Sequence, residues 1–73
     1  MSKNITAVVV LKDGSHRTWS AERDDKQSYA ACQRWLRDGI EMLRWDVQHL
    51  VICFSDHVSQ YTSGEVREIA GLV

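Results

Sequence analysis

Two extended runs near the start of the chain have the pattern of a β-hairpin, and the first of them is apolar on both faces. Two extended runs, Ile5–Leu11 and His16–Ala21, flank the segment Lys12-Asp13-Gly14-Ser15. Because Asp-Gly between extended runs favours a tight turn, these runs predict two antiparallel strands. With a two-residue turn, Val8 would face Trp19 across the hairpin and form an apolar pair.

A second apolar region, Val47–Phe54, is short and rich in branched side chains, which predicts a strand inside a sheet. Its alternation assigns Leu50, Ile52 and Phe54 to one face and Val47, His49, Val51 and Cys53 to the other. Because both sets are mostly apolar, we expect a central strand that is covered on both faces. After a turn at Ser55-Asp56-His57, the run Val58–Tyr61 predicts a further short strand at a sheet edge.

Between these strands, helical spacing extends from about Asp25 to about Leu43. Asp24 is the expected N-cap, with Gln27 as its capping-box partner. The apolar stripe consists of Tyr29, Cys32, Leu36, Ile40 and Leu43. Gly39 interrupts this stripe and could end the helix after Asp38. We favour a continuous helix, because Ile40 and Leu43 remain on the stripe.

The C-terminal segment predicts a short helix. Thr62-Ser63-Gly64-Glu65 fits a capping box. Val66, Ile69, Ala70 and Val73 follow at helical spacing, whereas a strand would place Val66 and Ile69 on opposite faces.

Together these patterns predict a single α+β domain over residues 1–73. It consists of a β-hairpin, one long helix, one or two further strands and a short C-terminal helix. The long helix would cover one apolar face of the sheet. The other face needs a cover as well, which could be the terminal helix, a second copy of the chain in a homodimer, or a partner.

Composition narrows the functional classes only slightly. The chain of 73 residues is 44% hydrophobic and 26% charged, which excludes a wholly disordered protein. Its net charge of −1 favours neither a basic DNA binder nor an acidic DNA mimic. The two cysteines lie in apolar patterns, which favours reduced thiols and a cytoplasmic location. We expect no secretory signal and no membrane segment, because the apolar runs fall short of the ~20 residues that span a bilayer.

Three arrangements of residues resemble catalytic or metal-binding motifs, but none of them has the geometry or exposure that such a site needs. His49, Cys53 and His57 are spaced by four, but on a strand such residues lie ~13 Å apart and cannot share one ion. The turn Ser55–Ser59 holds hydroxyls, a carboxylate and an imidazole, but neighbours in one turn rarely form a triad. Cys32 lies on the buried stripe, where thiols are inert. We therefore expect no enzyme, no catalytic residue, no metal and no cofactor.

A surface beside the helix stripe is the stronger candidate for function. Trp35 and Met42 lie about 100–120° around the helix from the centre of the stripe. They would either widen the core or form an exposed apolar shoulder. Aromatic, methionine and arginine side chains together are typical of interfaces. The predicted partner-binding residues are Trp35, Arg34, Arg37, Met42 and Trp45.

Basic residues on the helix support an alternative function. A nucleic-acid-binding module would use Lys26, Arg34, Arg37 and Arg44. Asp38 and Glu41 are interleaved with them, so that Arg34–Asp38 and Arg37–Glu41 can pair at four-residue spacing and neutralise this face.

The arrangement of elements is similar to that of small accessory proteins of bacteriophages and mobile elements, among them some anti-CRISPR proteins. The Val8–Trp19 hairpin with its Asp13-Gly14 turn, the Tyr29–Leu43 helix and the Val47–Phe54 strand carry the resemblance. It covers most of the chain but is architectural, so it transfers no functional residue. It implies a non-catalytic, phage-encoded inhibitor that binds a host protein or nucleoprotein complex. Many such inhibitors use acidic surfaces, and the near-neutral charge of this chain departs from that habit.

Overall fold

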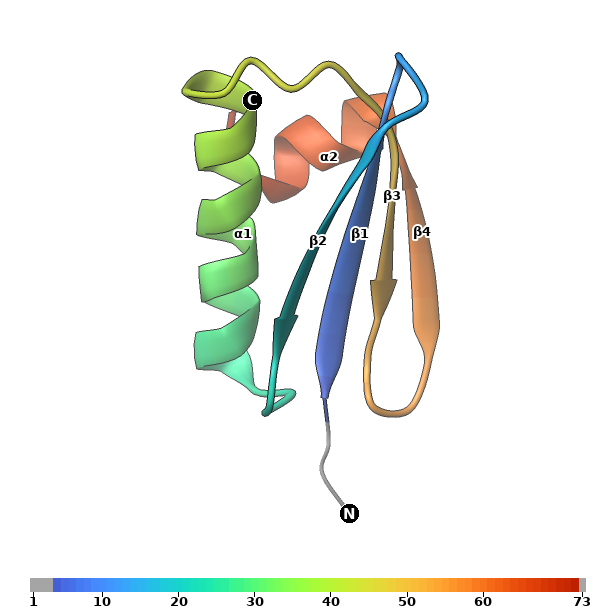
Figure 1. Cartoon of the computed structure of the whole chain (residues 1–73). Coiled ribbons are helices and arrows are strands. Elements are labelled where there is room, and N and C mark those ends of the chain that lie inside the picture. The colour runs from blue at the N-terminus through green and yellow to red at the C-terminus, as the bar shows by residue number, and fades with distance from the viewer. Residues whose placement is uncertain (1–3, 73) are drawn as a thin grey trace.

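The computed structural model describes residues 4–72 and has the predicted α+β architecture (Figure 1). Its elements are β1 (Ile5–Leu11), β2 (His16–Ala21), α1 (Lys26–Glu41), β3 (Val47–Cys53), β4 (Val58–Thr62) and α2 (Ser63–Ile69). The fourth strand and the C-terminal helix are both present. Thr62 and Glu65 form the expected capping box at the start of α2. Val73, which the spacing assigned to this helix, lies outside the described residues.

The four strands form one antiparallel sheet in the order β2-β1-β3-β4. The turn between β1 and β2 is one residue longer than expected. Gly14 has a φ of 91°, and its N–H donates to the carbonyl of Leu11 at 3.0 Å. The Leu11 N–H donates to the carbonyl of Ser15 at 2.8 Å and closes a loop of three residues. The expected Val8–Trp19 pair is therefore wrong: Trp19 lies opposite Ala7, and Val8 lies opposite Thr18.

A bulge in β3 changes which side chains face the core. Val10 pairs with His49 but Leu11 pairs with Val47, so Gln48 is an extra residue in the ladder. This shift places Val47, only 8% exposed, among the buried residues with Leu50 and Ile52. The strict alternation that grouped Val47 with His49 was wrong at this end of the strand.

Helix α1 is continuous through Gly39, as predicted, but its ends differ from the prediction. Its N-cap is Asp25, whose carboxylate accepts a hydrogen bond from the Ser28 N–H at 2.8 Å. Asp24, the expected cap, instead accepts hydrogen bonds from the backbone N–H and hydroxyl of Ser55. The helix ends at Glu41, and Leu43 is 67% exposed rather than part of the apolar stripe.

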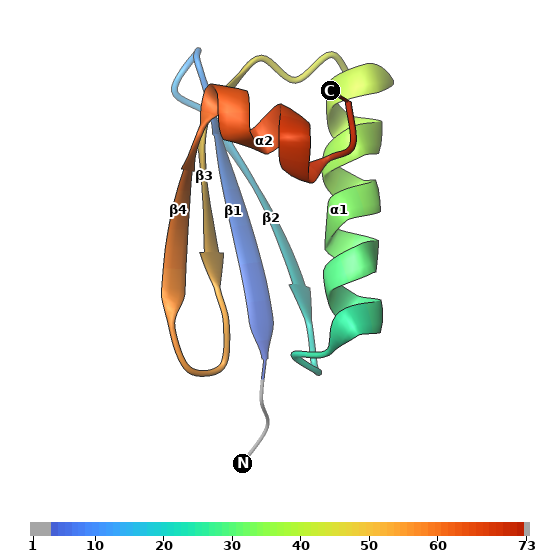
Figure 2. The same ribbon diagram turned by 180° about the vertical axis from the view of Figure 1, so that it is seen from behind.

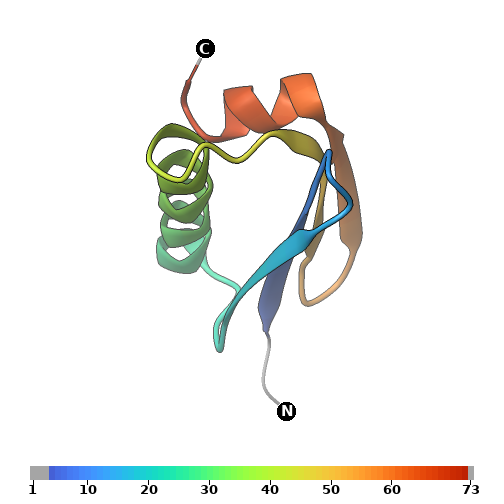
Figure 3. The ribbon, with the colours of Figure 1, turned by 45° about the horizontal axis from the view of Figure 1, so that its top comes forward.

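Both helices lie on the same face of the sheet (Figures 2 and 3). The buried core between them and the sheet consists of Ile5, Ala7, Val9, Leu11, Cys32, Leu36, Val47, Leu50, Ile52, Val66 and Ala70. Because α2 packs beside α1, it does not cover the second face. Of the three covers expected for that face, the terminal helix is therefore excluded, while coverage by a second copy or by a partner stays a prediction.

We call this second, uncovered side of the sheet the open face. The strand register places on it three residues from each strand. They are His16, Thr18 and Ser20 of β2, Thr6, Val8 and Val10 of β1, His49, Val51 and Cys53 of β3, and Val58, Gln60 and Thr62 of β4. The residues of the two inner strands are half-buried by their neighbours, and those of the two outer strands are exposed.

Candidate interaction surface

The three tryptophans form a cluster between α1 and the sheet. Trp35 stacks on Trp19 with ring centroids 6.5 Å apart and meets Trp45 edge-on at 5.1 Å. All three rings are half-buried and pack against the core. Trp35 and Trp45, two of the predicted contact residues, therefore widen the core as well as reaching the surface.

A chain reversal after α1 brings Trp45 back onto the helix. Arg44 adopts a left-handed backbone conformation with a φ of 59°. The Trp45 N–H then donates to the Gly39 carbonyl at 3.0 Å. The Trp45 ring lies across the bare backbone of Gly39, which is buried and leaves no room for a Cβ. Gly39 is thus the residue on which Trp45 docks, a role that the helical pattern alone did not indicate.

Met42 is placed very differently from the tryptophans. Its side chain is 75% exposed and that of its neighbour Leu43 is 67% exposed. Their backbone N–H groups donate to the Asp38 carbonyl at 2.8 and 3.3 Å, so the end of the helix holds them in place. We call Met42, Leu43 and Arg44 the Met42 surface. Leu43 was missed as a surface residue because its spacing fits the stripe.

The basic residues of α1 do not form one continuous patch. Lys26 begins the helix and Arg44 lies beyond its end, so the length of α1, about 24 Å, separates them. Arg37 Nε lies 2.8 Å from Glu41 Oε1, which is one of the two predicted ion pairs. Among the described residues, Arg34 and Arg44 make no ion pair. Arg34 is exposed on α1, two turns of helix before the chain reversal.

The turn between β3 and β4 does not assemble a catalytic triad. The Ser55 hydroxyl donates to Asp24 rather than to His57. His57 Nδ1 lies 2.6 Å from Asp56 Oδ1, and its ring stacks on Phe54 with centroids 4.5 Å apart. Within residues 4–72, no three His, Cys, Asp or Glu side chains are grouped so that they could hold a metal ion.

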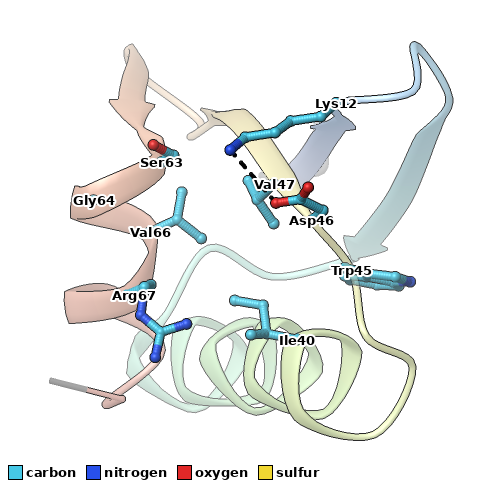
Figure 4. Close-up of a pocket in the computed structure, with 9 residues that line it drawn as sticks. All are labelled: Lys12, Ile40, Trp45, Asp46, Val47, Ser63, Gly64, Val66 and Arg67. Atoms are coloured by element: carbon cyan, nitrogen blue, oxygen red, sulfur yellow. Dashed lines mark ion pairs between the residues drawn. The ribbon is translucent and has the colours of Figure 1, made fainter.

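A hollow lies between the end of α1, the start of β3 and helix α2 (Figure 4). Its volume is about 220 Å³, and Ile40, Trp45, Val47 and Val66 form apolar walls. At its rim, Lys12 Nζ lies 3.6 Å from Asp46 Oδ1. Ligand pockets usually enclose about 300–1,000 Å³, so this hollow is small for an organic ligand.

Burial raises the pKa of the Cys32 thiol to about 11, from an ordinary value of 9.0. Between these values the unfolded chain loses the thiol proton while the folded protein keeps it. The free energy of unfolding should therefore keep its full value below about pH 9 and fall by up to about 1.4 kcal/mol per pH unit above it. Urea unfolding at pH 8 and pH 10 measures this slope.

A Cys32→Ala variant is the control for the thiol. It should be less stable at both pH values because it leaves a cavity. Its free energy of unfolding should nevertheless fall less between pH 8 and pH 10 than that of the wild type. Burial also raises the pKa of Tyr29, and that contribution is present in both proteins. Equal slopes for the two proteins would contradict the assignment to Cys32.

No protein-family model, curated protein or solved structure matches this chain. In the part of the chain that the structure describes, no helix is both long enough and apolar enough to cross a membrane.

Proposed function

We propose that the protein is a non-catalytic interaction protein that binds a host protein or nucleoprotein complex and blocks the surface it occupies. The observation that carries this proposal is the exposure of Met42 and Leu43, side by side at the end of α1. The arrangement of elements resembles that of small phage accessory proteins. This resemblance favours one form of the function, a phage-encoded inhibitor of the anti-CRISPR kind.

The Met42 surface has the chemistry of an interface. Burying an exposed methionine or leucine side chain fully is worth about 1.5–3 kcal/mol each. The backbone is already fixed by the hydrogen bonds to Asp38 and by the reversal at Arg44, so little further ordering is needed on binding. Arg44 adds a guanidinium that makes no ion pair among the described residues. The partner that fits is a protein surface with an apolar pocket bordered by carboxylates.

The predicted residues divide into two roles in this proposal. Met42 and Arg34 are exposed and would contact the partner, and the outer edge of Arg37 would add to them. Trp35 and Trp45 would support the surface from within. The nucleic-acid alternative, with Lys26, Arg34, Arg37 and Arg44, is the less favoured one, because Glu41 already pairs with Arg37 and the cations are spread along α1.

The double variant Met42→Asp/Leu43→Asp tests the proposal. Both side chains are exposed, so the fold should be retained, while two carboxylates should repel the acidic border of the partner. Wild type and variant are immobilised as matched baits in a bacterial lysate. A protein retained by the wild type is purified, and the variant should bind it at least about 30-fold more weakly, the factor for a 2 kcal/mol hot spot.

A Val58→Asp variant is the matched control. Val58 is 61% exposed and begins β4, at the opposite end of the molecule from the end of α1 (Figure 1). This variant should keep the affinity of the wild type. Equal binding by all three proteins would contradict the Met42 surface. Retention only of nucleic acid, lost as salt is raised, would favour the alternative.

A further inference from the structure

The open face of the sheet has an unusual charge composition. None of its twelve residues is Asp, Glu, Lys or Arg. Charged residues make up 26% of the chain, so about three would be expected among twelve positions. The outer side of α1, by contrast, carries Arg34, Arg37, Asp38 and Glu41. Depletion of charge, rather than hydrophobicity alone, distinguishes the centre of a protein interface from the remaining surface.

The arrangement of the open face is apolar at its centre and polar at its margins. The middle row across the four strands is Thr18, Val8, Val51 and Gln60. The two valines are half-buried at its centre, and the two polar side chains are exposed at its ends. An apolar centre with a polar rim is the usual organisation of a protein–protein contact.

We propose that two copies of the chain associate through their open faces. The argument for a second copy is self-complementarity. A hydroxyl, an amide or a neutral imidazole both donates and accepts hydrogen bonds, so each can pair with the same group of a twin. A charged side chain cannot pair with the same group of a twin, since like charges repel, and the open face has no Asp, Glu, Lys or Arg. Its lack of cations also makes it unsuited to nucleic acid. A two-fold dimer presents the same patch from both subunits.

The size of the open face sets the expected affinity. Four strands about 4.8 Å apart and about six residues long give a footprint of roughly 400 Å² per copy. Two such footprints total about 800 Å², below the ~1,200 Å² at which stable interfaces begin. The dimer should therefore be weak, with a dissociation constant in the range of about 10–500 μM.

Sedimentation equilibrium of the intact chain between 10 μM and 1 mM tests the proposal. The wild type should pass from monomer toward dimer over this range. Gln60→Lys and Val51→Lys should each remain monomeric, because they place like charges in the interface. Gln60 is exposed, so its substitution should leave the fold intact, which circular dichroism checks. The matched control is Met42→Lys, which adds the same charge outside the open face and should dimerise as the wild type does.

Residue-specific data separate this dimer from other modes of association. On dilution, amide NMR shifts should change for Val8, Val51 and Gln60 and stay constant for Arg34 and Met42. A wild-type protein that is monomeric at 1 mM would overturn the proposal. A dimer that survives both lysine substitutions would overturn it as well, whether its shift changes are confined to one edge strand, β2 or β4, as expected for edge-to-edge pairing, or lie on the helices. Neither result bears on partner binding by the Met42 surface, so the two proposals fail independently.

Discussion

Replacing Gly39 with alanine should destabilise the protein by about 2–3 kcal/mol, although alanine is the better helix former. Helix propensity alone would predict a gain of about 1 kcal/mol. A Cβ at this position, however, would overlap the six-membered part of the Trp45 ring. The indole is rigid and cannot yield locally, so the loop after α1 must shift and Trp45 must lose contacts. Thermal unfolding of wild type and Gly39→Ala measures the difference.

Two controls isolate the cause of this loss. Gly64 lies in α2, where a Cβ would meet no other atom within 4 Å, so Gly64→Ala should be neutral or stabilise by up to about 1 kcal/mol. In a Trp45→Ala background, adding Gly39→Ala should no longer be harmful, since the ring that it would strike is gone. If Gly39→Ala were equally destabilising with and without the Trp45 ring, contact with that ring could not be the reason.

The same pair of residues shows what helical periodicity can and cannot predict. The spacing of Leu36 and Ile40 was enough to predict a helix that continues through Gly39, and it does. It could not predict that the helix ends at Glu41, because that end depends on Trp45 returning across Gly39. A glycine inside a helix with a tryptophan six residues later was the available signal for such close packing.

The largest errors in the predicted fold arose where one additional residue shifts the pairing of two strands. Asp13-Gly14 is compatible with both a two-residue and a three-residue hairpin loop, and the choice decides which residue faces Trp19. The extra residue Gln48 in β3 has no signature in the sequence. Asp24 and Asp25 are the same residue type, so the sequence could not indicate which of them caps α1. The contact of Asp24 with Ser55, 31 residues away, leaves Asp25 to cap α1.

The candidate surface was only partly predictable for a similar reason. Helical angle places Trp35 and Met42 on nearly the same side of α1, seven residues apart. The exposure of the two side chains differs because only Trp35 lies opposite Trp19 of the edge strand β2. That contact depends on the register of the hairpin, and the register predicted from the sequence was wrong by one residue. The open face, by contrast, follows from the alternation of β1 and β3 once both helices are known to pack on one side.

Truncating Trp35 to alanine should lower the free energy of unfolding by about 2–3 kcal/mol, somewhat less than the 3–5 kcal/mol for a fully buried tryptophan. The ring bridges Trp19 of β2 and Trp45 of the loop, so its removal leaves both rings without their central contact. A chain of 73 residues is expected to be stable by only about 4–11 kcal/mol, so this loss is a large share of the total. The melting temperature should fall by about 10–20 °C.

Met42→Ala is the matched comparison on the same helix side. Its side chain is 75% exposed, so the substitution should change stability by no more than about 0.5 kcal/mol. Measuring both variants by urea and thermal unfolding therefore separates support of the core from contact with a partner. A Trp35→Ala protein that melts within about 2 °C of the wild type would mean that the ring is not needed by the core. Direct contact of Trp35 with the partner, which the helical pattern predicts, would then be the better interpretation. A Met42→Ala protein that is strongly destabilised would instead exclude Met42 as a free contact residue, because its side chain would have to be packed in solution.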